Sequence, residues 1–553
     1  MKRKDLPELD LTRIAQDEAR GIKFSPDKRT LKHYNAELAD ATYVIPDGVT
    51  AIGFQAFADC SKLTGVTIPD SVTTIHGDAF YDCSSLTRVV IPDSVEKIGS
   101  CAFEGCKNLA EVTLPAGLKK ISEHMFGGCQ KLTEVTIPAG VTKIENAAFI
   151  ACFGLTRMVI PEGVTKIDIA TFNGCTRLTK LTLPAGLTCI DAGAFRDCCR
   201  LTRVTIPDGV TTIGDLAFNG CEKLAEVTLP AGLTAIGDLA FNGCEKLAEV
   251  TIPDGVTTIG DLAFHGCKKL AEVTLPAGLT SIGNAAFRHC GKLTGMTLPA
   301  GLTSIGIAAF GGCGKLRISG SRRYCSDAAG ALFARNKRTL LHVPADFAGE
   351  YAIPEGVKTI ADSAFEECSG LTDVIIPESV TKIGDNAFGG CYNLAEVELP
   401  AGLTSIGCEA FALCGKLRIS GNERYYNDAA GALFDRKKQT LLRVPPDFAG
   451  TYKIPEGVKA VGEYAFSECG SLTAVEIPAG VKFIWEYAFS ECGSLTAVEI
   501  PAGVERIGTG AFFGCSGLKK VVLPDGIEIV GSEAFEGCPC LARLKKAYPQ
   551  FFK

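Results

Sequence analysis

The sequence predicts a β-rich α/β repeat protein in which short parallel strands stack into a solenoid. Two observations predict it. The stretch GDLAFNGCEKLAEVT stands at 214–228 and recurs, letter for letter, at 237–251. A proline that follows Ile or Leu also recurs at a constant step of 23 residues from Pro46 to Pro299. Identical units at a fixed period stack so that each covers the apolar side of its neighbour.

The period divides the chain of 553 residues into nineteen units in blocks of 12, 3 and 4, with a longer gap before each of the last two blocks. The predicted boundaries are an N-terminal cap with a degenerate hairpin at 1–43, repeats at 44–313, a hairpin insertion at 314–353, repeats at 354–414, a second hairpin insertion at 415–454, repeats at 455–538 and a C-terminal cap at 539–553.

Each unit reads L-x-x-V-x-[IL]-P-x-G-[VL]-T-x-I-G-x-x-A-F-x-x-C. Its first six positions alternate as a short strand, which the proline ends because proline cannot donate to a strand ladder. The glycine suits a turn, and a segment such as VTTIG is expected to be a second short extended run. A segment such as AFNGC predicts one helical or 3₁₀ turn.

A unit of this length and pattern is that of a leucine-rich repeat, with a parallel sheet on the concave side. The motif IPxGVTxIGxxAFxxC resembles the BspA-like leucine-rich repeats of bacterial and protist proteins, over about residues 44–544. The resemblance implies that the protein is bacterial. It also implies a protein of a kind often found at the cell surface, where such proteins bind host proteins or proteins of neighbouring cells.

The two gaps predict β-hairpins. Strand-like runs lie around 331–333 and 339–343, and again around 432–434 and 440–444, separated by the basic turns ARNKR and DRKKQ. A degenerate copy stands at 22–34. Each hairpin either caps the edge of a block or projects as a ligand-binding element. The segment LARLKKAYPQFF predicts a short amphipathic helix over the last coil.

The chain has 25 cysteines, of which nineteen occupy one register, three residues after the repeat phenylalanine. Inward packing is the favoured interpretation, because parallel side chains in one register do not face each other; disulfides and metal binding are the alternatives. No metal site or cofactor is predicted. Interchangeable units also argue against an enzyme, because an active site needs one asymmetric cluster. The six remaining cysteines are candidate exposed thiols: Cys101, Cys189, Cys199, Cys325, Cys408 and Cys540.

The third and fifth positions of L-x-x-V-x-L should point outward onto the concave sheet, and the third position carries runs of charge. A basic patch is therefore predicted beside an acidic ladder, with further acidic positions in the later blocks. A solvated face kept by recent duplication is the alternative. The candidate binding residues are Arg157, Lys180, Arg203, Glu226, Glu249, Glu272, Glu396, Glu398, Glu476 and Glu499.

The leading functional hypothesis is a non-enzymatic protein that binds another protein through the concave face, in an adhesion-like role. An intracellular scaffold or injected effector using the same surface is the alternative. A glycan binder is a third hypothesis, with Tyr324, Tyr425 and Tyr426 as its aromatic contacts. A net charge of −7 argues against nucleic acid as the main partner, and no apolar run predicts membrane insertion. The first residues lack an apolar h-region, so no signal peptide is predicted and the chain as written would be cytoplasmic.

Overall fold

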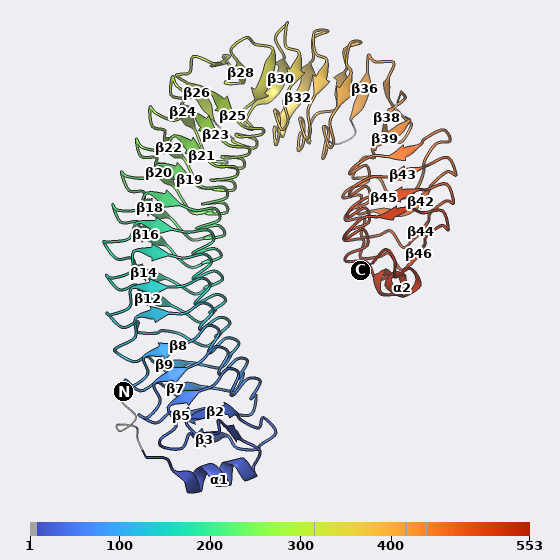
Figure 1. Ribbon diagram of the computed structural model, residues 1–553. Helices are drawn as coiled ribbons and strands as arrows, with labels where there is room; N and C mark the ends of the chain where they lie inside the picture. Colours follow the sequence, from blue (N-terminus) through green and yellow to red (C-terminus); the bar gives the residue numbers. More distant parts are fainter. Residues whose placement is uncertain (1–7, 315, 415–416, 438, 553) are drawn as a thin grey trace. The chain divides into compact units, whose positions relative to one another are not determined.

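The structure is a computed structural model that describes residues 8–314, 316–414, 417–437 and 439–552. Residues 1–7 of the expected N-terminal cap therefore lie outside the described residues. The chain divides into two compact units, Met1–Phe310 and Gly311–Lys553. Within each unit, strands of successive repeats pair in parallel, as β12 (Arg157–Val159) does with β14 (Lys180–Thr182) (Figure 1). The predicted parallel solenoid is confirmed in both units.

A repeat typically contributes two strands, and these form two ladders; the repeat at 132–154 contributes only β11. The first ladder contains the strand that precedes the repeat proline, and the second ladder contains the strand that follows the glycine. In β16 (Arg203–Thr205), Val204 is buried while Arg203 and Thr205 are exposed, and the flanking Leu201 and Ile206 are buried. The predicted alternation of inward and outward side chains is thus confirmed.

In the first unit, the first ladder consists of β3 (Thr42–Val44), β5 (Gly65–Thr67), β7 (Arg88–Val90), β9 (Glu111–Thr113), β12, β14, β16, β18 (Glu226–Thr228), β20 (Glu249–Thr251), β22 (Glu272–Thr274) and β24 (Gly295–Thr297). The second ladder consists of β1 (Lys23–Phe24), β2 (Thr30–His33), β4 (Ala51–Ile52), β6 (Thr74–Ile75), β8 (Lys97–Ile98), β10 (Lys120–Ile121), β11 (Lys143–Ile144), β13 (Lys166–Ile167), β15 (Cys189–Ile190), β17 (Thr212–Ile213), β19 (Ala235–Ile236), β21 (Thr258–Ile259), β23 (Ser281–Ile282) and β25 (Ser304–Ile305).

In the second unit, the first ladder consists of β26 (Arg317–Ser319), β30 (Ala348–Ala352), β32 (Gly370–Ile375), β34 (Glu396–Glu398), β36 (Arg418–Ser420), β40 (Gly450–Lys453), β42 (Leu472–Glu476), β44 (Ala497–Glu499) and β46 (Lys520–Val522). The second ladder consists of β29 (Thr339–His342), β31 (Thr359–Ile360), β33 (Lys382–Ile383), β35 (Ser405–Ile406), β39 (Thr440–Arg443), β41 (Ala460–Val461), β43 (Phe483–Ile484), β45 (Arg506–Ile507) and β47 (Ile529–Val530).

The segment around the repeat phenylalanine is not the helical or 3₁₀ turn that we predicted. Leu216 and Gly220 adopt φ values of 59° and 71°, which a right-handed helical turn excludes. The N–H of Phe218 instead donates to the carbonyl of Ala240 in the next repeat at 2.8 Å. The segment is a chain of tight turns that forms a third hydrogen-bonded ladder, because alternate N–H groups point along the stack and not along the local chain.

The core of each unit is a stack of repeat phenylalanines beside a row of thiols. The ring centroids of Phe218 and Phe241 lie 5.3 Å apart with the rings 5° from parallel. The Cys244 Sγ donates to the carbonyl of Phe218 at 3.4 Å. All nineteen in-register cysteines are buried, which confirms the packing interpretation, and burial raises the pKa of the Cys244 thiol well above its ordinary value.

The six off-register cysteines divide into three groups. Cys408 is exposed as expected, and Cys101, Cys189, Cys199 and Cys325 are half-buried. Cys540 is buried, so its expected exposure was wrong. It directly precedes the C-terminal helix α2 (Leu541–Ala547), and its side chain packs with the hydrophobic core of the second unit.

Both predicted hairpins are confirmed, and each is larger than expected. β28 (Leu332–Ala334) pairs antiparallel with β29, and β38 (Leu433–Asp435) with β39. A further antiparallel strand precedes each pair, β27 (Tyr324–Ser326) and β37 (Tyr425–Asn427). The last hairpin strand then pairs in parallel with the next repeat and so begins its second ladder. The hairpins are therefore part of the sheets.

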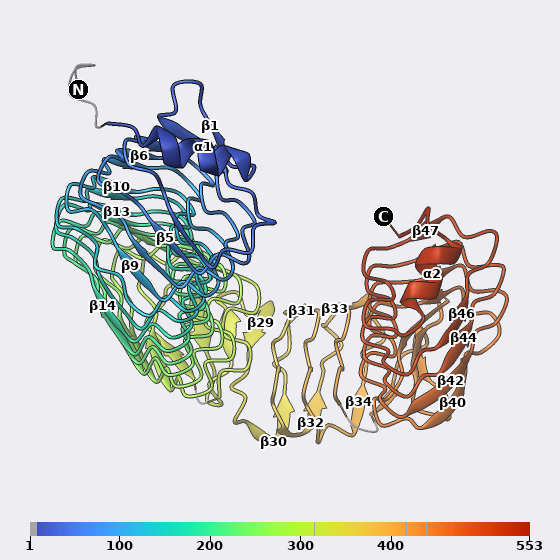
Figure 2. The same cartoon turned by 90° about the horizontal axis from the view of Figure 1, so that it is seen from below.

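Among the described residues, the helices α1 and α2 lie near the N-terminal and C-terminal ends (Figure 2). The predicted C-terminal helix is α2, and the Tyr548 hydroxyl beyond it donates to the carbonyl of Leu523 at 3.1 Å. The helix α1 (Leu11–Ala19) was not predicted. Its signal is Asp10, whose side chain accepts from the N–H of Arg13 at 2.9 Å as an N-cap.

Candidate protein-binding surface

The third positions of consecutive first-ladder strands form one exposed row, which we call the charged column. It contains all six candidate residues of the first unit, one from each of β12, β14, β16, β18, β20 and β22. Each begins its strand and points away from the core: Arg157, Lys180, Arg203, Glu226, Glu249 and Glu272. The structure thus brings these six together. That this face is the concave one stays a prediction.

Strand register sets which charges are neighbours. Arg157 is in register with Lys180, and Glu249 with Glu272, so like charges stand side by side at both ends of the column. Such neighbours repel mildly. The two signs meet at Arg203 and Glu226, which are also in register.

The first ladder is not continuous beneath the column. The N–H of Ile160 donates to the carbonyl of Thr182 at 3.0 Å, and that of Ile252 to Thr274 at 3.0 Å. β12 pairs with β14 and β16 with β18, while β20 and β22 continue into β24, and the second ladder runs unbroken from β10 to β25. The strand pairing beneath the column is therefore interrupted twice, between β14 and β16 and between β18 and β20.

The same column extends towards the N-terminus, which the sequence analysis missed. Arg88 is in register with Glu111, and their side chains form an ion pair with Nε 3.4 Å from Oε2. Glu134 occupies the third position of the following repeat. The signal was present, because these residues occupy the same motif position as the six that were chosen.

The candidate acidic residues of the second unit have different surroundings. Glu396 and Glu398 are in register with Arg418 and Ser420. Glu476 forms an ion pair with Lys453, with Nζ 3.7 Å from Oε2. Glu499 lies beside Val522. A cation therefore accompanies Glu396 and Glu476, and these residues do not form an uninterrupted acidic ladder.

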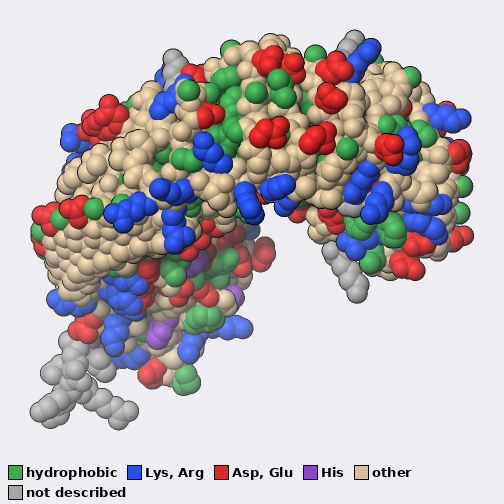
Figure 3. Space-filling view, turned by 90° about the horizontal axis from the view of Figure 1, so that it is seen from above, with side chains coloured by type: hydrophobic (Ala, Val, Ile, Leu, Met, Phe, Trp, Pro, Cys, Tyr) green, Lys and Arg blue, Asp and Glu red, His purple; other side chains and the backbone are tan. Residues whose placement is uncertain are grey.

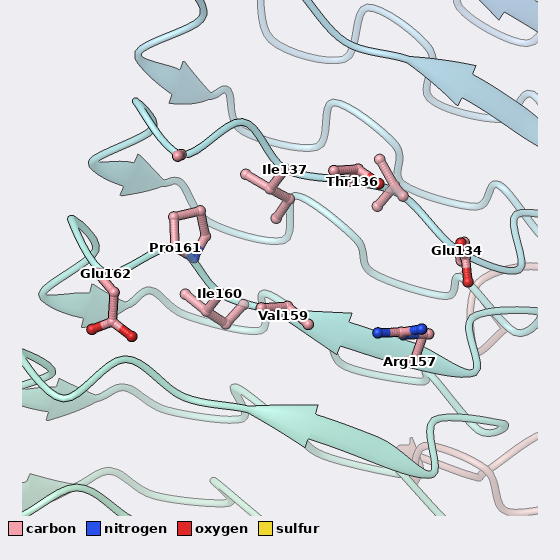
Figure 4. A pocket seen from close by; sticks show the side chains of 10 residues that line it. Glu134, Thr136, Ile137, Arg157, Val159, Ile160, Pro161 and Glu162 are labelled. Atoms are coloured by element: carbon pink, nitrogen blue, oxygen red, sulfur yellow. The ribbon is translucent and has the colours of Figure 1, made fainter. Parts of the chain in front are cut away.

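A groove of about 570 Å³ opens on the same face between the repeats at 132–139 and 155–162 (Figure 4). No strand is assigned at 134–136, so the ladder is parted here. Ile137 and Ile160 form an apolar floor, and the half-exposed Val159 lies beside them. Glu134 and Arg157 lie at one end and Glu162 at the other. The groove can take an apolar side chain flanked by charge.

Charges of both signs are interspersed elsewhere on the surface. Figure 3 shows acidic and basic side chains mixed over the face it displays, with no large area of one sign. Across the part of the chain that the structure describes, no three His, Cys, Asp or Glu side chains are grouped to hold a metal ion. None of the described helices has the length and apolar character needed to cross a membrane.

The hairpin tyrosines, named as glycan contacts, are held against the protein. Tyr425 is buried, with the Arg424 guanidinium 5.0 Å from its ring centroid. Tyr426 stacks on Phe434 with centroids 5.2 Å apart. Tyr324 is half-buried.

Comparison with protein families gives a match to the profile described as BspA type Leucine rich repeat region (6 copies). It covers residues 34–156, 142–270, 234–319, 349–424 and 450–547. The chain belongs to the BspA-type leucine-rich repeat family. This confirms the resemblance drawn from the repeat motif. A search of curated proteins found no match to this chain.

Among solved structures, the BspA-type chain is similar to leucine-rich repeat proteins of several bacteria. The one from Bacteroides ovatus is 21% identical, with 96% of each chain covered and a TM-score of 0.29. That from Eubacterium ventriosum is 23% identical over 61% of this chain and 89% of the other, with a TM-score of 0.35. The T. pallidum leucine-rich repeat protein is 27% identical over 45% and 86%, with a TM-score of 0.26.

Proposed function

We propose that this BspA-type protein is a non-enzymatic binding protein that recognises another protein through the face carrying the charged column. The observation that carries the proposal is the column itself: six exposed charges, in register on successive strands, with like charges adjacent. Adjacent like charges repel and slightly lower the stability of the unbound protein, and a partner of complementary charge would offset that repulsion.

The groove supports the same face as the binding surface. It shares Arg157 with the column and adds an apolar floor with the half-exposed Val159 beside it. Protein interfaces combine a desolvated apolar centre with a polar rim, and the groove and the column supply these two parts side by side. An apolar side chain of a partner would enter beside Val159 while the column contacts its charged surroundings.

We further propose that the protein acts at the cell surface in an adhesion-like role, as its membership of the BspA-type family suggests. Antibody labelling of intact cells that express the native gene, compared with lysed cells, gives the location. Labelling only after lysis would favour the intracellular scaffold or effector instead.

The binding proposal is tested on the association rate. The immobilised full chain captures a partner from a surface-protein extract, and the purified partner is then measured by biosensor. Replacing the three acidic residues by Lys (E226K/E249K/E272K) should slow association strongly, and the rate for the native chain should fall as salt rises. The matched control, E96K/E123K/E528K, changes the charge equally at exposed positions outside the column and should bind as the native chain does.

The contrary result has a defined form. If association ignores the column reversal but responds to changes at Arg335 or Lys437, in the exposed hairpin turns, the hairpins are the binding surface. Asp215 and Asp238, which lie in the turns before the repeat phenylalanine, are unsuitable as controls. Their Oδ1 atoms accept the N–H of the next repeat at 2.8 and 2.7 Å, so changing them would disturb the stack.

A further inference from the structure

The charged column has an order that is complementary to its own reverse. From β12 to β22 it runs through three cations and then three anions. Read from the other end, every cation position becomes an anion position. The midpoint lies between Arg203 and Glu226, on the paired strands β16 and β18.

We propose that this face binds a second copy of the same chain, related by a two-fold axis that lies in the interface parallel to β16 and β18. The inference rests on the proposed function, because it names the partner of the same face. A two-fold contact brings one patch against its own copy. An axis parallel to the strands reverses the order of the repeats while keeping the column opposite itself.

This arrangement places every charge of the column opposite its counter-charge. Arg157 faces the partner's Glu272, Lys180 faces the partner's Glu249, and Arg203 faces the partner's Glu226. An axis along the stack would instead set each charge against the same charge. Only the antiparallel arrangement is therefore favourable, and opposed charges fix its register.

The rows beside the column agree with this arrangement. In the six units of the column, the residue after the repeat proline is alternately acidic and alanine, from Glu162 to Ala277. The two-fold axis sets Glu162 against the partner's Ala277 and Asp208 against the partner's Ala231. Thr156, in the second position of its repeat motif, would meet the partner's Ala271. Acidic residues of this row thus lie opposite alanines and not opposite acidic residues of the partner. The small side chains also let the two sheets approach.

One row opposes the contact and limits its strength. In five of the six units an exposed cation precedes the repeat leucine, and the axis sets Arg200 against the partner's Lys223 and Arg177 against the partner's Lys246. Six strands about 4.8 Å apart also span only about 24 Å. That length is short for a standard interface, so we expect a weak dimer whose association falls steeply as salt rises.

The test uses the full chain in sedimentation velocity at low and high salt, with two triple variants. R157E/K180E/R203E makes the whole column acidic, and E226K/E249K/E272K makes it basic. The native chain should self-associate at low salt, and each triple variant alone should be monomeric. Mixed in equal amounts, the two variants should form a heterodimer. A variant that combines all six substitutions exchanges the basic and acidic halves of the column and should self-associate again. Unchanged thermal unfolding establishes that each variant is folded.

Two results would overturn the inference: a native chain that stays monomeric at low salt, or self-association that both triple variants retain. Failure of the mixed variants to associate would do the same. If the mixture fails while a different protein partner still loses association on column reversal, the face binds protein but not its own copy. If no partner responds to the reversal either, the proposed function fails as well.

Discussion

Arg203 and Glu226 form an ion pair between adjacent parallel strands, with Nη2 3.5 Å from Oε2, although about 70% or more of each side chain is exposed. Exposed pairs contribute little to stability because water screens the attraction and two long side chains lose freedom. A double-mutant cycle of R203A, E226A and the double variant should therefore give a coupling free energy below about 1 kcal/mol. Urea unfolding monitored by circular dichroism measures it.

The same two residues should matter much more for binding than for folding. If the coupling free energy of unfolding instead exceeds about 2 kcal/mol, the pair is part of the fold and the column loses its interpretation as a surface available to a partner. The cycle of Arg88 and Glu111, which form the equivalent pair nearer the N-terminus, is the matched comparison and should give a similarly small value.

Much of the fold could be predicted because the motif repeats. The inward positions of Leu201, Val204 and Ile206 follow from the alternation of side chains along a strand, and nineteen copies leave no doubt about the period. The hairpin at β28 and β29 follows from two apolar runs with a basic turn between them. The six first-unit candidates lie together because a constant period places one motif position in one row.

Other features have no local signal in the sequence. The groove lies at Glu134–Thr136, yet LTEVTIP at 132–138 has the same pattern as its neighbours, so the parting of the strands depends on packing between repeats. The third ladder was missed because its turns need positive φ at residues such as Leu216, where the sequence shows no glycine. The cations beside Glu396 and Glu476 were missed because Arg418 and Lys453 lie in the segment 415–454, which was predicted to be a hairpin insertion and not a repeat.

A tyrosine to carboxylate hydrogen bond recurs at the start of each block. The hydroxyl of Tyr351 donates to Asp327 Oδ2 at 2.6 Å, and Tyr43 and Tyr452 make the same bond to Asp17 and Asp428. A hydrogen bond to a charged group contributes more to the stability of a folded protein than a bond between neutral groups. Y351F should therefore lower the free energy of unfolding by about 1–3 kcal/mol, measured by urea titration.

The exposed Tyr392 provides the control for this prediction. Y392F should leave the unfolding midpoint unchanged. If Y351F is as stable as the native chain, the recurring bond does not hold the hairpin to the first repeat of its block, and the contact with Phe347, at 5.3 Å between ring centroids, is sufficient.

The thiols should divide sharply in their reactivity. The nineteen in-register cysteines are buried and should resist a thiol reagent until the protein is denatured, when 25 thiols should react. Cys408 is exposed, but partial burial and a hydrogen bond from its Sγ to Glu463 Oε2 at 2.9 Å raise its pKa to about 12. E463Q removes the carboxylate charge, so the pKa should fall and labelling at pH 8 should become several-fold faster.

The exposed Glu456 lies outside the groups that shift this pKa, and E456Q is the matched variant for the labelling experiment. It should label at the native rate. Rapid native labelling of most thiols, or fewer than 25 after denaturation without reductant, would contradict the packing of reduced cysteines in the core.

The last prediction concerns His342, which is buried on β29 at the end of the first hairpin. Burial, with a smaller contribution from the Arg317 charge, lowers its pKa from 6.5 to about 3. The unfolded chain therefore takes up a proton on this side chain as the pH falls below 6.5, while the folded chain does so only near pH 3. Stability from this group is complete above pH 6.5 and decreases as the pH falls towards 3. Between pH 7 and pH 5 the loss should be about 2 kcal/mol.

H342Q removes the titrating group, so the free energy of unfolding in urea should differ less between the two pH values, by that amount, whatever the variant's stability at pH 7. H76Q, at an exposed position, is the matched control and should keep the native pH dependence. An unchanged dependence in H342Q would mean that His342 is protonated in the folded protein at pH 5, and that the hairpin opens or rearranges to hydrate it.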